Sequence, residues 1–148
     1  MPSLSDAQNQ LSYEMAVYRE QINMLKRETE RVSLTALDLS NALKTVESLE
    51  KNNSLVPIGG GVLIKAHISE TKVLLPVGGG YLIETSKEGA TIELNKRIDS
   101  TRKAVEKLND EFNKISMKLR EVSNQLQDVR VQSQIDKTAE SNIRDDYL

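Results

Sequence analysis

Mostly apolar residues recur every seven positions along the first third of the chain. Two interleaved sets of positions form this seam: Leu4, Leu11, Tyr18, Leu25, Val32, Leu39 and Val46, and, offset by four, Gln8, Met15, Ile22, Thr29, Ala36 and Leu43. No proline or glycine interrupts the pattern between residues 3 and 51. A seam sustained over about six heptads is typical of a coiled coil. The pattern predicts a helix over residues 4–52.

The second half of the chain carries the same repeat. Its two sets are Ile98, Val105, Phe112, Leu119 and Leu126, and Leu94, Thr101, Leu108, Ile115, Val122 and Val129. The seam fails after Val129, where Ser133 and Asp136 take the next core positions. At the start, Thr85 and Glu88 have the spacing of a capping box, although Gly89 weakens the first turn. We predict a helix over residues 86–140 and a tail over 141–148.

Neither seam can exclude water alone, so the two helices are expected to fold back as an antiparallel pair. One register satisfies both seams with these neighbours: Val46 with Ile98, Val32 with Phe112, Leu25 with Leu119, and Met15 with Val129. A shift by one heptad works equally well. The topology is therefore predicted and two registers stay open.

The centre of the chain, residues 54–85, contains an internal repeat with an offset of 19 residues. Pro57 matches Pro76, the triplet 59–61 matches 78–80, and residues 63–64 match 82–83. Each copy is a β-rich run, a glycine turn and a second β-rich run, which predicts a hairpin. Glycines permit the positive φ angles of tight turns. The predicted turn glycines are Gly59, Gly60, Gly61, Gly78, Gly79 and Gly80.

Four short strands of this kind expose apolar faces and unpaired edges. The apolar residues that they carry are Val56, Ile58, Val62, Ile64, Ile68, Val73, Leu75, Val77, Leu82 and Ile83. A lone hairpin is marginal in water, and open edges invite pairing. Strands from other subunits could close such hairpins into a barrel. We predict an α+β fold: a long antiparallel two-helix coiled coil whose two central β-hairpins form an inter-subunit β-barrel.

Three segments in this order carry a family resemblance. They are Leu55-Val56-Pro57-Ile58-Gly59-Gly60-Gly61-Val62, then Val77-Gly78-Gly79-Gly80-Tyr81-Leu82-Ile83-Glu84, then Lys96-Arg97-Ile98 inside the second heptad helix. With the flanking helices, the chain resembles the α-type subunits of prefoldin over essentially its whole length. Two hairpins rather than one favour the α type over the β type.

The resemblance implies a single prefoldin-like domain over residues 1–148. It also implies a hetero-hexamer of two α-type and four β-type subunits, with a double β-barrel from which six coiled coils extend. The implied activity is that of an ATP-independent chaperone, which holds unfolded proteins between the coiled-coil tips and passes them to a group II chaperonin. No cofactor is implied.

The expected tips lie at the two chain ends, where the seam turns polar but apolar residues continue. These candidate client-binding residues are Leu4, Leu11, Ile135, Ile143, Tyr147 and Leu148. Side chains without an intramolecular partner would capture clients weakly, and several tips together would gain through effective concentration. The alternative is that the ends simply fray and have no role.

Composition and charge exclude several other classes of function. The net charge of −2 and pI of about 5.5 provide no basic surface for nucleic acid. The absence of cysteine excludes disulfides and thiolate metal sites. Neither a signal peptide nor an apolar stretch long enough for a membrane span is apparent, which predicts a soluble, cytoplasmic protein. Only 3% of residues are aromatic, so the core is expected to be shallow or completed by partners.

No catalytic or metal-binding constellation is apparent. His67 is the sole histidine and lies in a predicted strand, and neither glycine triplet continues as a phosphate-binding loop. We therefore expect no enzyme activity. Two alternatives to a chaperone remain: a coiled-coil tether that homo-oligomerises through its hairpins, and a regulatory module that binds one partner. The repeated hairpins favour the chaperone, since a plain spacer has no need of two.

Overall fold

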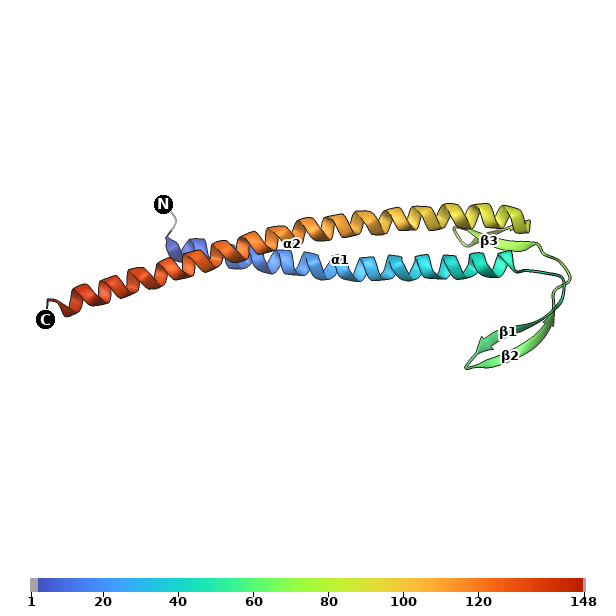
Figure 1. Cartoon of the computed structure of the whole chain (residues 1–148), viewed down its shortest axis with the longest axis horizontal. Coiled ribbons are helices and arrows are strands. Elements are labelled where there is room, and N and C mark those ends of the chain that lie inside the picture. The colour runs from blue at the N-terminus through green and yellow to red at the C-terminus, as the bar shows by residue number, and fades with distance from the viewer. Residues whose placement is uncertain (1–2, 148) are drawn as a thin grey trace. The chain divides into compact units, whose positions relative to one another are not determined.

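The structure is a computed structural model that describes residues 3–147 (Figure 1). The elements follow in the order α1 (Leu4–Glu47), β1 (Asn53–Gly59), β2 (Val62–His67), β3 (Val73–Gly78), β4 (Tyr81–Thr85) and α2 (Lys87–Asp145). The chain divides into two compact units. The hairpin unit comprises residues 32–105, and the coil unit comprises residues 1–31 and 106–148. Two long helices flanking two hairpins confirm the predicted α+β architecture.

Helix α1 begins with a capping box that was not predicted. The Asp6 N–H donates to the Ser3 hydroxyl (3.1 Å), while the Asp6 carboxylate accepts from the Ser3 hydroxyl (2.7 Å) and the Ser3 N–H (3.1 Å). The two hydrogen bonds that the Asp6 carboxylate accepts lower the pKa of Asp6, and the bond from the Ser3 hydroxyl contributes more than the bond from the Ser3 N–H. The capping box satisfies N–H groups that the start of a helix otherwise leaves without partners.

The predicted helix end at residue 52 is wrong, because α1 stops at Glu47. The last carbonyls find partners outside the helical pattern: the Ser48 hydroxyl donates to the Thr45 carbonyl (3.0 Å). Beyond the helix, the Lys87 ammonium donates to the Leu49 carbonyl (3.2 Å). The chain between Glu47 and Asn53 is thereby free to turn into β1, which residues in helical conformation could not do.

Helix α2 starts and ends differently from the prediction. The Ser86 hydroxyl accepts from the Gly89 N–H (3.1 Å), so the N-cap is Ser86 and not Thr85. The helix continues to Asp145, and the predicted tail is therefore wrong for residues 141–145. No proline or glycine follows Gly89, so the loss of the apolar seam brings in no residue that breaks the helix.

Gly89 lies at a crowded position in the first turn of α2. A Cβ built there would collide with the Thr85 Oγ1. Replacing a helical glycine by alanine usually stabilises by about 1 kcal/mol. We expect Gly89→Ala to give none of this gain, because Thr85 must change its rotamer to make room.

The gain should appear when Thr85 is first replaced by alanine, and a double-mutant cycle of unfolding free energies measures it. Equal effects of Gly89→Ala in the two backgrounds would show that the collision has no energetic cost.

The coil unit packs the predicted seam along both helices. Ile115, Val122 and Leu126 of α2 are buried. Leu25 of α1 lines one groove with Leu108 and Ile115, and the Lys26 ammonium lies 6.0 Å from the ring centroid of Phe112. Leu25 is therefore level with Phe112 and not with Leu119, which favours the register shifted by one heptad in this stretch.

Nearer the chain ends, Met15 of α1 shares a groove with Ser123, Leu126 and Arg130 of α2. These neighbours extend from beside Val122 to beside Val129, which are the partners of Met15 in the shifted and the first register, so this groove is compatible with both registers.

The hairpin unit has its own small core. Leu75 of β3, with 7% of its surface exposed, is buried together with Ala90 and Leu94 of α2. Four half-buried side chains pack around them: Leu39, Leu43 and Val46 of α1, and Val73 of β3. The second hairpin is thus attached to both helices through one face of β3.

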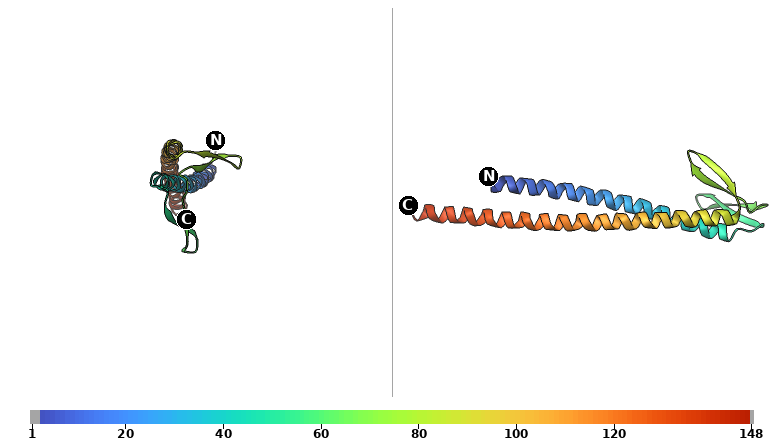
Figure 2. Two further views of the ribbon diagram at one scale, coloured as in Figure 1. Left: turned by 90° about the vertical axis from the view of Figure 1, so that its right-hand side faces the viewer. Right: turned by 90° about the horizontal axis from the view of Figure 1, so that it is seen from above.

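The two hairpins form separate two-stranded antiparallel sheets, β1–β2 and β3–β4, which Figure 2 shows as distinct ribbons. The turn glycines at 59–61 and 78–80 all have positive φ. At Gly60, φ is 58° and no atom lies within 4 Å of a built Cβ. Backbone conformation and not space therefore calls for glycine at this position.

Candidate functional site

The first hairpin is apolar and exposed on both faces. Val56 lies opposite Ile64, and strand alternation places Ile58 and Val62 on the same face. All four are exposed, Ile58 to 66%. Leu55 and Leu63, which the sequence analysis did not select, are exposed on the other face. Apolar residues at consecutive strand positions were the signal that could have found them.

The second hairpin exposes less of its apolar surface to solvent than the first hairpin does. Val77, Leu82 and Ile83 are exposed, as are Leu74 and Tyr81, which were not selected from the sequence. Leu75 and Val73, both proposed as assembly residues, instead contribute to the chain's own core. One face of this hairpin is therefore partly used within the chain.

Ile68 was also proposed as an assembly residue. It follows β2, is half-buried, and its N–H donates to the Asn52 carbonyl (2.8 Å). This bond closes the base of the first hairpin. Ile68 thus lies where the two strands leave the hairpin and not on its exposed faces.

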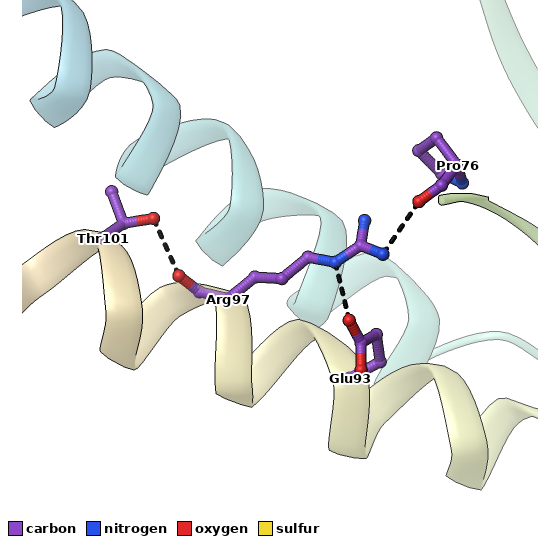
Figure 3. A network of polar contacts seen from close by, with 4 residues as sticks. All are labelled: Pro76, Glu93, Arg97 and Thr101. Carbon is purple, nitrogen blue, oxygen red and sulfur yellow. Dashed lines mark hydrogen bonds and ion pairs between the residues drawn. The ribbon is translucent and has the colours of Figure 1, made fainter. Parts of the chain in front are cut away.

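Arg97 connects the second hairpin to α2 (Figure 3). Its Nη2 donates to the Pro76 carbonyl (2.8 Å), and its Nε donates to Glu93 Oε1 (3.0 Å). The Thr101 hydroxyl donates to the Arg97 carbonyl (2.7 Å). Glu93 therefore orients the guanidinium toward β3, and the hydrogen bond to Pro76 spans a long separation in sequence.

The proposed tip residues lie at the end of the coil unit formed by both chain ends. Leu4, Ile135, Ile143 and Tyr147 are exposed, Tyr147 to 87%, whereas Leu11 is half-buried in the seam. Leu148 lies outside the described residues. Within this unit, the C-terminal end of α2 extends beyond the N-terminal end of α1 (Figure 1). Tyr13 and Val131 are further exposed apolar residues, at positions off the heptad seam.

Other chemistry is sparse in the described part of the chain. Among residues 3–147, no group of three or more His, Cys, Asp or Glu side chains is arranged to hold a metal ion. The His67 Nδ1 lies 3.0 Å from Asn53 Oδ1 on the neighbouring strand, a contact within the first hairpin. No helix in the same residues is long and apolar enough to span a membrane.

Comparison with known proteins decides the family. The sequence profile of the family described as "Prefoldin subunit" matches residues 18–132, most of the chain. The chain belongs to the prefoldin family. Prefoldin is a family of non-enzymatic chaperones whose subunits assemble with one another, so this chain is a prefoldin chaperone subunit.

The curated relatives are archaeal α subunits. The chain is 27% identical to prefoldin subunit alpha of Methanococcus aeolicus over 103 residues, covering 68% of this chain and 72% of that one. It is 26% identical to prefoldin subunit alpha 1 of Methanocaldococcus jannaschii over 119 residues, covering 80% and 78%. These matches and the two hairpins identify an α-type prefoldin subunit, as the sequence predicted.

Solved prefoldin structures share the fold. Filamentous PFD from Methanocaldococcus jannaschii aligns with a TM-score of 0.65 and 22% identity, over 76% of this chain and 97% of that one. The prefoldin beta subunit from Thermococcus strain KS-1 aligns with a TM-score of 0.63 and 20% identity, over 86% and 96%. The likeness extends over nearly the full length of both neighbours.

Proposed function

We propose that this prefoldin subunit assembles through its hairpins with β-type subunits, two α-type with four β-type chains, into a shared β-barrel platform. The exposed apolar faces of the first hairpin carry the proposal. Val56, Ile58, Val62 and Ile64 form one of these faces, and burying such side chains contributes about 1.5–3 kcal/mol each. A two-stranded ribbon with both faces in water is marginal by itself, so neighbouring strands would stabilise it.

The same proposal assigns the helix ends to client capture. Ile135, Ile143 and Tyr147 are exposed, and the first two lie within α2, whose helix continues to Asp145. A helical end presents these side chains on a defined surface, which a frayed end would not. Each contact with an unfolded protein is weak, and several subunits in one assembly make capture effective. The held protein then passes to a group II chaperonin.

The assembly works in the cytoplasm with neither nucleotide nor cofactor, and this chain contributes no catalysis. Holding an unfolded protein needs only reversible apolar contact, which requires no chemical step. The exposed apolar side chains of the helix ends and hairpins are sufficient for both parts of the function.

One experiment tests the proposal directly. The purified chain is mixed with a β-type prefoldin subunit, and native mass and ATP-free suppression of aggregation of an unfolding protein are measured. We expect a hexamer with two copies of this chain, and protection that neither subunit gives alone. A chain that remains a folded monomer beside the β-type subunit would contradict the proposal.

The tether that homo-oligomerises is the second candidate, and one observation favours it. The neighbour from Methanocaldococcus jannaschii is a filamentous PFD, so this fold is compatible with filaments. Under this alternative, the chain alone forms long assemblies without a β-type subunit and gives no protection. Mass measurements on the unmixed chain distinguish the two functions.

A further inference from the structure

One side of the coil unit carries basic and neutral residues and no acid. In an antiparallel coiled coil, the residues directly after one set of core positions on each helix flank the seam on the same side. Here they follow the first set on α1 and the second set on α2, and they are Ser5, Ser12, Arg19 and Lys26, and Asn109, Ser116, Ser123 and Arg130. We call this the basic side. The Lys26 ammonium, 6.0 Å from the Phe112 ring centroid, shows that this side of α1 faces α2.

The opposite side of the coil unit has the reverse charge. Its residues directly precede the second set of core positions on α1 and the first set on α2, and they are Ala7, Glu14, Gln21 and Glu28, and Glu111, Lys118, Gln125 and Gln132. Three acids stand here against one base, whereas the basic side has three bases and no acid. The charges of a chain whose net charge is only −2 are therefore separated between two sides of one rod.

A groove of about 580 Å³ runs along the basic side. Its lining includes three small residues, Ser12 and Ala16 of α1 and Ser123 of α2. The buried seam residue Leu126 also lines it, so the base of the groove is apolar. Small side chains at the walls let an added chain approach this base closely.

One arginine from each helix lines the same groove. Arg19 of α1 and Arg130 of α2 are both exposed, and neither has a carboxylate partner in the part of the chain that the structure describes. Arg31, by contrast, is paired with Glu28 at 2.6 Å. The guanidinium donors of Arg19 and Arg130 therefore remain available for carboxylates that an added chain brings.

We propose that the basic side of the coil unit binds extended segments of unfolded proteins that combine carboxylates with apolar side chains. The proposal rests on the proposed client capture and adds to it a preference for acidic clients. Helix α1 rises about 10 Å over residues 12–19, which is the length of about three residues of extended chain. A segment of this length places an apolar side chain over Leu126 and carboxylates near Arg19 and Arg130.

A nucleic acid fits this side less well than an acidic peptide. Phosphate backbones bind to continuous tracks of lysine and arginine. On the basic side, neutral residues separate the bases, and the base of the groove is apolar. Apolar contact beside a charge suits a protein segment.

Two peptide probes test the proposal on the complex with a β-type subunit. One short peptide alternates leucine and glutamate, and the other has glutamine in place of each glutamate. Arg19→Gln with Arg130→Gln should weaken binding of the glutamate peptide about fivefold or more, because both charges at the groove are lost. Binding of the glutamine peptide should stay within about twofold of its value in the unchanged complex.

Arg27→Gln with Lys118→Gln is the matched control. It also removes one base from each helix, but Lys118 lies in the groove on the opposite side and Arg27 lies off both sides. Binding of the glutamate peptide should then stay within about twofold. Circular dichroism of each variant establishes that the helices still form.

Salt provides a second readout that lost folding would not imitate. The unchanged complex should bind the glutamate peptide more tightly than the glutamine peptide at low salt, and added salt should reduce this difference by screening. The variant that lacks Arg19 and Arg130 should show little difference at any salt concentration. A single-stranded oligonucleotide serves as a third probe, and tighter binding of it than of the glutamate peptide would overturn the proposal.

The outcomes separate this proposal from the proposed function. If both double variants lose the glutamate peptide equally, or the unchanged complex binds the two peptides alike, the role of the basic side is overturned. Client capture still stands in that case if the unchanged complex suppresses aggregation. If the unchanged complex protects no client, the proposed capture itself fails. If no complex forms, the proposed assembly fails, and the same peptide comparison on the free chain decides the role of the basic side.

Discussion

Replacing Ile58 and Ile64 together by lysine is expected to abolish assembly with the β-type subunit. Both side chains are exposed on one face of the first hairpin, and neither packs on a helix of the chain. Losing their burial costs about 4 kcal/mol at an interface, which weakens association about a thousandfold. Placing two ammonium groups on that face adds a desolvation cost. Titration with the β-type subunit, followed by native mass, measures the loss.

The control places the same charges elsewhere in the hairpin unit. Leu34 and Leu37 of α1 are as exposed as the hairpin residues but lie on a helix surface. Leu34→Lys with Leu37→Lys should keep assembly within twofold. Helical content should match the unchanged chain in both variants, since neither substitution touches the buried cluster of Leu75, Ala90 and Leu94. Undiminished assembly of the hairpin variant would refute the use of this face.

The sequence predicted the elements well where a periodic pattern specifies them. Heptads extend through α1 and through α2 as far as Val129, and the glycine triplets mark both turns. Element ends were predicted less well because local hydrogen bonds decide them. α1 ends where the Ser48 hydroxyl donates to the Thr45 carbonyl, and α2 begins at the hydroxyl of Ser86 and not of Thr85. Serine ranks above threonine as an N-cap, but the capping-box spacing of Thr85 and Glu88 favoured the wrong residue.

The internal repeat hid the main difference between the two hairpins. Val56 and Leu75 occupy equivalent positions, yet Val56 is 42% exposed and Leu75 is 7% exposed. β4 runs almost directly into α2, so the second hairpin is held against Ala90 and Leu94. The first hairpin has longer connections on both sides and stays clear of the helices. Tertiary packing breaks a symmetry that strand patterning cannot resolve.

The hydrogen bond from Arg97 to the Pro76 carbonyl gave no signal in the sequence. Arg97 is one of many charged residues on an amphipathic helix, and a proline in a strand predicts an edge without saying what covers it. The tip residues were easier to select, since apolar side chains past the end of a seam stand out. Leu11 shows the limit of that approach, because a heptad position keeps it half-buried.

Replacing Ile135, Ile143 and Tyr147 together by serine is expected to lower client holding at least tenfold and to leave assembly unchanged. These side chains are exposed on or just beyond the end of α2, far along the chain from the hairpins. Each loses about 1.5 kcal/mol or more of apolar contact with a client. Because several tips act on one client, the losses multiply through effective concentration. ATP-free suppression of aggregation, measured at equal concentrations of assembled complex, gives the ratio.

Met117→Ser provides the control, because Met117 is an exposed apolar residue of α2 in the coil unit but lies away from its end. It should keep holding activity within twofold. If holding survives in the triple variant, apolar surface elsewhere binds the client and the helix ends have no role in capture. If the triple variant instead fails to assemble, the ends take part in subunit association. Either result would contradict the proposed function, which assigns client capture to the helix ends and assembly to the hairpins.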